Sequence, residues 1–451
     1  GIRDAQESRG LGDVYKRQAH ILGYIGKADL SAKQEEENYH YYLPEVEGKD
    51  GIEKQFNKEL AGEPGVMLIR VDVSGFKSSQ IIGWEPKAGM DVILTIDSQV
   101  QKTAEQMLEG EKGAVVVIDV RNGDIIAMAS SPSFDPNYFV GGGSDVIQKL
   151  IENEAHPLYN RAISGLYPPG STFKPVVAMA AIDSGVASQS TSFECNGQFV
   201  LGNMKFACWR KRGHGSLDMA GALEQSCNVY FCNLGTICGP ENIIKMARLF
   251  GFGKITGVDL PGEKEGLVPD KEWKRKVMKE GWRGGDTCNM SIGQGALLVT
   301  PLQMVLFTTA IATKGKVYVP RIVAEPDSDR KLLRQLSLSE KGWNVIREGM
   351  ERVVNVTDGT GKRAALPGIK VAGKTGTAEY GPKDARRKYG WMIAYAPAGD
   401  PQYAAVVVIE NAVSGGITAA PRMREIMARL FRKTVEIEIE TTEEEIVEVD
   451  G

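Results

Sequence analysis

The order of apolar and polar residues predicts a protein of mixed strands and helices. A strand is predicted over Gly89–Asp97, and a helix over Ser98–Gly110, where apolar residues recur with a helical period. Two strand-like runs, Ala114–Val120 and Asp124–Ser130, flank Asn122-Gly123, a pair of residues typical of a tight hairpin turn. The main folded domain is therefore expected to begin with two antiparallel strands.

Later apolar patterns extend this prediction to a sheet covered by helices. The segment Phe134–Tyr159 has the character of a loop. Helices are predicted over Thr172–Gly185, Gly221–Leu234, Thr300–Lys314 and Ala419–Lys433, and strands over Ile369–Thr377, Tyr389–Ala396 and Tyr403–Asn411. Strands followed by helices and then by strands indicate the α/β (α+β) class, with an antiparallel sheet flanked by helices.

Length and composition limit the classes of protein. With 451 residues the chain is long enough for two or three domains. Its formal net charge of −4 and the lack of a basic cluster argue against nucleic acid as a partner. No apolar run approaches the eighteen or so residues that a membrane-spanning helix needs.

Composition along the chain predicts four segments. Residues 1–18 lack an initiator Met and any clear period, so a non-native or disordered leader is expected there. Residues 19–110 are expected to form a partial N-terminal module and linker, and residues 111–433 the main domain. Residues 434–451 are acidic, which predicts a solvated tail.

Three short motifs carry the candidate chemistry. They are Ser171-Thr172-Phe173-Lys174, Ser226-Cys227-Asn228 and Lys374-Thr375-Gly376-Thr377. Each motif alone is weak. A helix N-cap with a solvated lysine explains the first motif better than chemistry does, a polar helix cap likewise explains the second, and a Gly-rich edge strand explains the third equally well. Their common order and wide spacing instead indicate one site of acyl transfer by a serine nucleophile.

The residue types fit that chemistry. Ser171 follows Pro-Pro-Gly at a predicted helix start, and Lys174 at i+3 lies on the same helix face. A serine hydroxyl needs a base, and a lysine becomes one when burial or a second cation such as Lys374 lowers its pKa.

The other two motifs supply further groups. Ser226 can relay a proton to a leaving amine, while the Asn228 amide can hold a substrate carbonyl. Thr375, Gly376 and Thr377 lie on a strand that can pair with an extended peptide. The backbone N–H groups of Thr377 and Ser171 are candidates for an oxyanion hole.

Together with further segments, these motifs resemble the class B penicillin-binding proteins. The supporting segments are Ala19–Tyr24, Gly51–Phe56, Leu94–Asp97, Pro132–Asn137, Asn160-Arg161-Ala162, Gly293-Gln294-Gly295 and Thr300–Gln303. Cys208-Trp209 and Gly213-His214-Gly215 favour similarity to penicillin-binding protein 2, the cell-elongation type. One departure is Asn228, where that type often has Asp.

The resemblance implies a peptidoglycan D,D-transpeptidase with a penicillin-binding domain and a partial dimerisation-type module. Ser171 would attack the penultimate D-Ala of a stem peptide with Lys174 as base, and β-lactams would acylate it as mimics. The chemistry would need no cofactor. The resemblance also implies a lipid-II polymerase and elongation scaffold proteins as partners, a periplasmic or extracytoplasmic location, and a membrane anchor that is absent from this chain.

All six cysteines fall between Cys195 and Cys288. A possible structural zinc site is formed by Cys195, Cys208, His214 and Cys227. The resemblance supports it, because some elongation-type relatives carry zinc beside the active site. A Cys195–Cys208 disulfide or buried thiols remain alternatives. Cys232, Cys238 and Cys288 are expected in the core, and His20, His40 and His156 in packing or surface positions.

Three related activities remain open beside transpeptidation. A serine β-lactamase of class A would add a Glu in an E-x-x-L-N segment, which is absent between Gly251 and Val268. A non-enzymatic β-lactam sensor domain is disfavoured by the long segment from Ala19 to Asp97. A D,D-carboxypeptidase differs only in using water as the acceptor, and the sequence does not exclude it.

Overall fold

The computed structural model describes residues 18–28, 46–63, 65–140, 143–326, 330–382 and 385–432. His40, the tail predicted from residue 434 and nearly all of the leader lie outside these residues. The chain divides into two compact units. The first comprises Gly1–Leu94, Ser133–Leu158 and Asp259–Pro261, and the second comprises Thr95–Pro132, Tyr159–Val258 and Gly262–Gly451.

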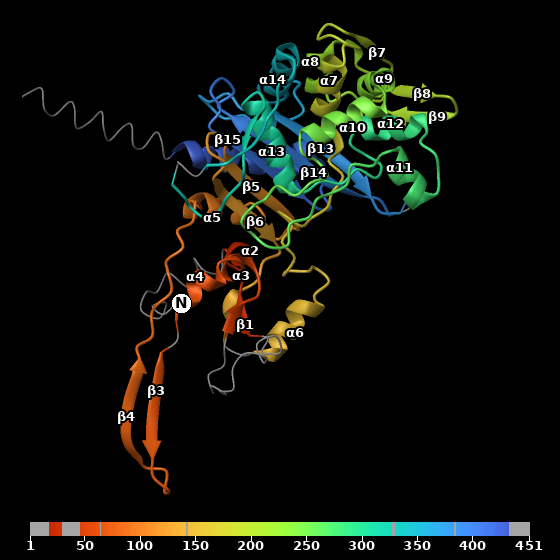
Figure 1. The fold of residues 1–451 in the computed structure, drawn as a ribbon. Helices are drawn as coiled ribbons and strands as arrows, with labels where there is room; N and C mark the ends of the chain where they lie inside the picture. The colour runs from red at the N-terminus through yellow and green to blue at the C-terminus, as the bar shows by residue number, and fades with distance from the viewer. Residues whose placement is uncertain are drawn as a thin grey trace, which may run out of the picture. The chain divides into compact units, whose positions relative to one another are not determined.

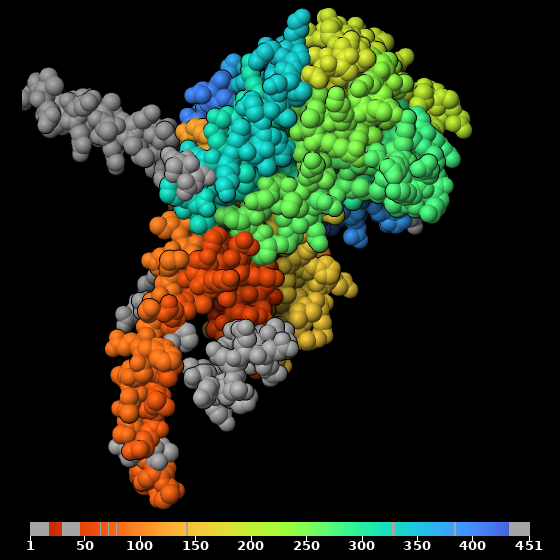
Figure 2. All heavy atoms as spheres, in the orientation of Figure 1, coloured from red at the N-terminus to blue at the C-terminus, as the bar shows by residue number. Residues whose placement is uncertain are grey.

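The first unit is built from short elements. Its helices are α2 (Ala19–Leu22), α3 (Gly51–Gln55), α4 (Asn57–Ala61), η2 (Pro136–Phe139) and α6 (Ser144–Glu152). Its strands form two separate antiparallel pairs, β1 (Ile25–Lys27) with β2 (Val46–Gly48), and β3 (Val66–Val71) with β4 (Lys77–Trp84). The β3–β4 hairpin, orange in Figure 2, carries exposed apolar side chains that include Leu68, Ile81 and Trp84.

The second unit is organised around a five-stranded sheet of order β13-β14-β15-β5-β6 (Figure 1). All neighbours in it are antiparallel, as predicted. Its strands are β5 (Gly113–Asp119), β6 (Ile125–Ser131), β13 (Ala372–Tyr380), β14 (Arg387–Ala396) and β15 (Tyr403–Ile409). The predicted hairpin at Asn122-Gly123 joins β5 to β6, and β13 forms one edge of the sheet.

Helices cover both faces of this sheet. All twelve residues of α13 (Pro301–Ala312) are buried, because α13 packs on β5, β14 and β15. Another core contains residues of α5 (Ser98–Gln106), the end of α14 (Glu340–Asn355) and the helix over 420–432. With helices on both sides, β5 is buried at every one of its seven residues.

The second unit contains further short strands and helices outside the five-stranded sheet. They are η3 (Gly170–Phe173), α7 (Lys174–Asp183), β7 (Phe193–Cys195), β8 (Gln198–Leu201), β9 (Met204–Ala207), β10 (Gly215–Leu217), α8 (Met219–Glu224), α9 (Asn228–Cys238), α10 (Pro240–Leu249), α11 (Lys271–Trp273), η4 (Lys274–Met278), α12 (Gly284–Ser291), β11 (Lys316–Tyr318), β12 (Leu332–Gln335), η6 (Lys362–Ala364) and η7 (Gly415–Ala419).

Three predicted elements were wrong. Gly89–Asp97 forms no strand. Thr95 in this segment donates its backbone N–H to the Ile322 carbonyl and its hydroxyl to the Ile125 carbonyl, but the segment does not pair along its length as a strand would. Phe134–Tyr159 is not simply a loop, since it contains η2 and α6. Gly221–Leu234 is not one helix, because Ser226 has φ 51° and separates α8 from α9.

Candidate functional site

A tight turn brings Ser171 against strand β13. Gly170 has φ 56°, and a Cβ on it would lie 2.8 Å from the Thr377 carbonyl oxygen. Gly293 has φ 70°, and a Cβ there would lie only 2.0 Å from the Gly170 carbonyl oxygen. Glycine at both positions lets three backbone segments meet at the turn that starts the helical stretch η3–α7.

Lys174, the first residue of α7, is fully buried beneath this turn. Its Nζ donates to the Ser226 carbonyl at 2.7 Å and to Asn228 Oδ1 at 2.8 Å, with Ser226 Oγ at 3.3 Å. Burial disfavours the charged form and lowers the pKa of Lys174 to about 8. An amine with such a pKa is neutral often enough near neutral pH to act as a base.

Ser226 and Asn228 occupy the break between α8 and α9. Ser226 is buried and has a left-handed backbone, a conformation that costs roughly 1–3 kcal/mol in a non-glycine residue and is often found at functional sites. Asn228 begins α9 and donates through Nδ2 to the Ala207 carbonyl at 3.2 Å. The break therefore aims both polar side chains at Lys174.

Lys374 reaches the same hydroxyl from strand β13. Its Nζ donates to Ser226 Oγ at 2.8 Å and to the Thr375 carbonyl at 3.0 Å, and its side chain is fully buried. Burial, and then the nearby charge of Lys174, hold the pKa of Lys374 well below its ordinary value. Two ammonium groups cannot share one buried hydroxyl cheaply, so the cluster favours a state with one lysine neutral.

Strand β13 lies at the sheet edge, and among the described strands its ladder partner is β14. A Cβ on Gly376 would lie 2.9 Å from the Pro169 carbonyl oxygen, so glycine permits the close approach of the Ser171 turn. Thr375 Oγ1 donates to Thr360 Oγ1 at 3.0 Å, and Thr377 Oγ1 accepts from the Gly415 N–H at 3.2 Å.

The structure thus brings all three sequence motifs together. Within the part of the chain described, the Ser171 hydroxyl itself makes no hydrogen bond, and Lys174 points instead to Ser226 and Asn228. Sequence reasoning missed Thr360, which has no motif of its own. It also gave no role to Gly293, although the Gly-Gln-Gly segment signalled an unusual backbone.

The four residues of the predicted metal site also meet, next to the second motif. Their ligand atoms lie within 4.8 Å of one another. His214 Nδ1 lies 3.5 Å from the sulfur atoms of both Cys195 and Cys208, and the sulfurs of Cys208 and Cys227 are 4.0 Å apart. Tetrahedral zinc with Zn–S bonds of about 2.3 Å separates two sulfurs by roughly 3.8 Å, so the donor set fits zinc.

The thiols in this cluster are not equivalent. The hydrogen bond between Cys208 and Cys227 lowers the pKa of the Cys208 thiol, and the same bond, together with burial, raises the pKa of Cys227. All six cysteines are free thiols, and Cys232, Cys238 and Cys288 are buried as expected. His20 is buried against Phe134, and His156 is exposed.

Comparisons with known proteins agree with the two parts of the chain. Residues 113–428 match the family described as penicillin binding protein transpeptidase domain, and residues 14–94 match the penicillin-binding protein dimerisation domain. The peptidoglycan D,D-transpeptidase MrdA of Acinetobacter baumannii is 36% identical over 433 residues, which cover 90% of this chain and 63% of that protein. The chain therefore spans about two thirds of the length of this curated relative.

Solved structures give the same answer. A complex between penicillin-binding protein 2 and MreC from Helicobacter pylori matches with a TM-score of 0.82 at 34% identity, over 93% of this chain and 78% of that one. A second match is a chain of a peptidoglycan synthase complex, in a structure that concerns the coordination of polymerization and crosslinking. Its TM-score is 0.81 at 31% identity, over 91% of this chain and 74% of that one. The chain belongs to the class B penicillin-binding proteins, in the group of penicillin-binding protein 2.

Proposed function

We propose that this chain carries the D,D-transpeptidase activity that cross-links peptidoglycan stem peptides during cell elongation. The observation that carries this proposal is the convergence of Lys174 and Lys374 on the Ser226 hydroxyl, beside the turn that presents Ser171. The arrangement supplies a nucleophile, a base and a route for a proton to a leaving amine.

Acylation begins at Ser171. Neutral Lys174 takes the hydroxyl proton while Ser171 Oγ bonds to the carbonyl carbon of the penultimate D-Ala. The bond from this carbon to the nitrogen of the terminal D-Ala then breaks. The departing amine receives a proton through Ser226, whose hydroxyl lies 2.8 Å from Lys374 Nζ. The products are free D-Ala and an ester on Ser171.

Strand β13 would hold the substrate during this step. Its outer edge can pair with an extended stem peptide, and Thr375, Gly376 and Thr377 are the proposed binding residues. The backbone N–H groups of Ser171 and Thr377 would stabilise the negative charge on the tetrahedral intermediate. Asn228 keeps Lys174 in place through its 2.8 Å hydrogen bond and leaves the lysine without a carboxylate at that position.

The second half-reaction distinguishes this enzyme from its relatives. The amine of a neighbouring stem attacks the ester and forms the cross-link, whereas attack by water would give a D,D-carboxypeptidase. A β-lactam would leave a long-lived ester on Ser171, because its ring-opened product keeps the acceptor away. A β-lactamase would instead release the hydrolysed drug rapidly.

Labelling with a fluorescent penicillin tests the proposal. We expect one stable adduct, which mass spectrometry of a tryptic digest places on Ser171, and no adduct with Ser171→Ala. Fast turnover of the drug would indicate a β-lactamase, and no adduct at all would reject the proposed site. Incubation with pentapeptide donor and a stem-peptide amine then separates a cross-linked product from simple D-Ala release.

We propose in addition that Cys195, Cys208, His214 and Cys227 hold a structural zinc ion. The support is the donor set and its spacing, with three buried thiols and a half-buried His214 ring. Cys227 also caps α9 by accepting from the Tyr230 N–H at 3.4 Å. A bound ion would brace the loop that presents Ser226 and Asn228, and the acyl transfer itself needs no cofactor.

The wider assignments are proposals as well. We place the module at 19–110 and the transpeptidase domain at 111–433, with a periplasmic or extracytoplasmic location. The named complexes support an elongation scaffold and a lipid-II polymerase as partners, besides stem peptides and β-lactams. In the described residues, no helix combines the length and apolar character needed to cross a bilayer.

A further inference from the structure

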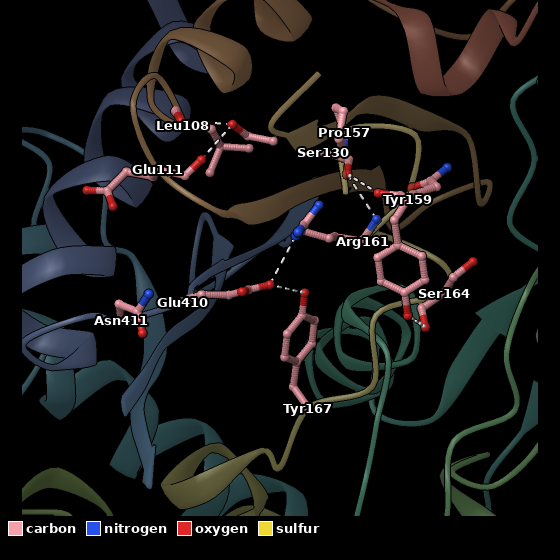
Figure 3. Close-up of polar contacts among 12 residues, drawn as sticks. Leu108, Glu111, Ser130, Pro157, Tyr159, Arg161, Ser164, Tyr167, Glu410 and Asn411 are labelled. Carbon is pink, nitrogen blue, oxygen red and sulfur yellow. Dashed lines mark hydrogen bonds and ion pairs between the residues drawn. The ribbon is translucent and has the colours of Figure 1, made fainter. Parts of the chain in front are cut away.

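A largely buried polar network includes two residues that lie shortly before Ser171 in the sequence, Arg161 and Tyr167, and one from the other end of the domain, Glu410. Glu410 Oε1 accepts from Arg161 Nε at 3.0 Å and from the Tyr167 hydroxyl at 3.0 Å (Figure 3). Arg161 and Tyr167 are only 3% and 4% exposed. None of these three residues belongs to the motifs that carry the chemistry, yet Tyr167 precedes Ser171 by four positions.

The network joins distant parts of the second unit. Glu410 directly follows β15, which lies two strands away from β13 in the sheet. Arg161 is fixed independently, because its backbone N–H donates to Ser130 Oγ at 2.9 Å next to β6's end. Glu410 is fixed through its own N–H, which donates to the Lys112 carbonyl at 2.8 Å. Glu410, which accepts from Tyr167, and Arg161, which donates to Glu410, are therefore each fixed by a further backbone hydrogen bond.

The segment between Tyr167 and Ser171 is tied down at successive positions. Tyr167 exchanges backbone hydrogen bonds with Val299, at 3.0 and 2.9 Å. Trp391 Nε1 donates to the Pro168 carbonyl at 3.0 Å, and the Gly170 N–H donates to the Gly293 carbonyl at 2.9 Å. The Tyr167 hydroxyl is the side-chain anchor of this series.

The same segment also packs against β14, the ladder partner of β13, which is the strand that we propose binds substrate. The ring of Tyr167 packs edge-on against Tyr389 and Trp391, with centroids 5.0 and 5.9 Å away. In the ladder, Tyr389 lies opposite Ala378 and Trp391 opposite Gly376. A shift of Tyr167 would therefore move the Ser171 turn relative to β13.

We propose that Tyr167, Glu410 and Arg161 are positioning residues that set the place of Ser171 against strand β13. This inference rests on the proposed acyl-transfer function. The Tyr167 hydroxyl bonds to Glu410, Glu410 is held by Arg161, and the turn follows Tyr167. A displacement of the nucleophile by about 1 Å is enough to slow a reaction about a hundredfold.

Two properties suit the network to this role. Burial, and then the Glu410 charge, raise the pKa of Tyr167, so its hydroxyl remains a donor at every physiological pH. An ion pair buried in this way is not itself an efficient stabiliser, since well-packed apolar side chains often serve stability as well or better. Hydrogen bonds, however, are directional, so they define the position of the turn more precisely than apolar packing would.

The test compares Tyr167→Phe with Tyr159→Phe in penicillin acylation. Tyr159 lies in the same region, but its hydroxyl donates to the Ser164 carbonyl rather than to Glu410. Phenylalanine keeps the ring over which the Arg161 guanidinium lies, so this variant loses one hydroxyl and keeps the network. For Tyr167→Phe we expect the maximal acylation rate constant to fall at least tenfold, with the non-covalent dissociation constant changed less than twofold. For Tyr159→Phe both constants should stay within twofold of the parent protein.

Glu410 supplies a graded series. Glu410→Gln keeps an oxygen acceptor for Tyr167, whereas Glu410→Ala removes it, so the glutamine variant should acylate faster than the alanine variant. Thermal melting measured in parallel separates this effect from loss of fold. The proposal is overturned if Tyr167→Phe acylates at the parental rate, or if rates follow melting temperatures across all four variants. Failure of the unmodified protein to react would instead reject the acyl-transfer function itself.

Discussion

Lys374 Nζ and Ser226 Oγ lie 2.8 Å apart, and both residues are buried. Lys174 Nζ approaches the same hydroxyl at 3.3 Å. Because one hydroxyl lies between two amines, a proton can pass from one lysine to the other without entering solvent. The chemistry that we propose depends on this shared hydroxyl, and the protonation of Lys174 gives the first prediction.

Acylation should depend on pH through Lys174. Its pKa is lowered to about 8, mainly by burial, and only the neutral amine can accept the Ser171 proton. The acylation rate constant should therefore rise about tenfold per pH unit below pH 8 and level off above it. Stopped-flow measurements with a β-lactam from pH 6 to 9 will show this rise, which forms the ascending limb of the pH–rate profile. A rate that does not change over the range would exclude Lys174 as the base.

Asn228→Asp should move that limb to higher pH. The new carboxylate would lie where Asn228 Oδ1 now accepts from Lys174 Nζ at 2.8 Å, and a nearby negative charge favours the charged lysine. We expect the midpoint to rise by about one pH unit and the rate at pH 7 to fall about tenfold. The same pH series on the variant measures the shift.

Asn233→Asp is the matched control, since Asn233 is also on α9 and also donates to a backbone carbonyl. Its profile should follow that of the parent protein. Equal shifts in both variants would mean that general charge, rather than contact with Lys174, sets the midpoint.

Gly293→Ala should disturb the turn that carries Ser171, the proposed nucleophile. The new Cβ would overlap the Gly170 backbone, 2.0 Å from its carbonyl oxygen, in addition to the strain of φ 70°. We expect a loss of about 3 kcal/mol in unfolding free energy and a large loss of penicillin labelling. Chemical denaturation and labelling rates measure the two effects.

Gly185→Ala separates strain from overlap. Gly185 has a similar φ of 75°, but a Cβ there meets nothing within 4 Å. This variant should lose only about 1–2 kcal/mol and label normally. If the two variants behaved alike, backbone conformation alone would explain the requirement for glycine.

Purified protein should contain about one zinc ion per chain, bound by the Cys195, Cys208, His214 and Cys227 cluster. Cys195→Ser should lose the metal, whereas Cys238→Ser, a change at a buried cysteine outside the cluster, should retain it. Elemental analysis measures the content, and a chelator should lower the melting temperature of the parent but not of Cys195→Ser. A metal-free protein with a Cys195–Cys208 disulfide would reject the zinc site.

Local patterns predicted much of the fold. The β5–β6 hairpin follows from Asn122-Gly123, and α13 follows from its apolar residues and the capping of its first turn by Thr300. The strand expected over Gly89–Asp97 failed because an extended apolar segment needs a partner in a ladder, which a local pattern cannot show.

The sequence predicted which residues make up the candidate site better than it predicted the tertiary contacts that join them. The three motifs were found because their residues are chemically distinctive and ordered. A turn at Ser226 and Asn228 was expected, but the helix drawn over Gly221–Leu234 ran through it, because tertiary contacts of the Ser226 side chain offset an unfavourable φ of 51° within an otherwise helical pattern. The Arg161–Glu410 pair spans 249 positions, and no short pattern can relate residues so distant.

The position of β13 at the edge of the sheet has a consequence for selectivity. Backbone pairing along an edge strand takes little account of side chains, so many extended peptides can align there. A D-residue next to the scissile bond turns its side chain to the side opposite that of an L-residue. Under the proposed mechanism, the handedness of a single residue would therefore separate stem peptides from the L-peptides of other proteins.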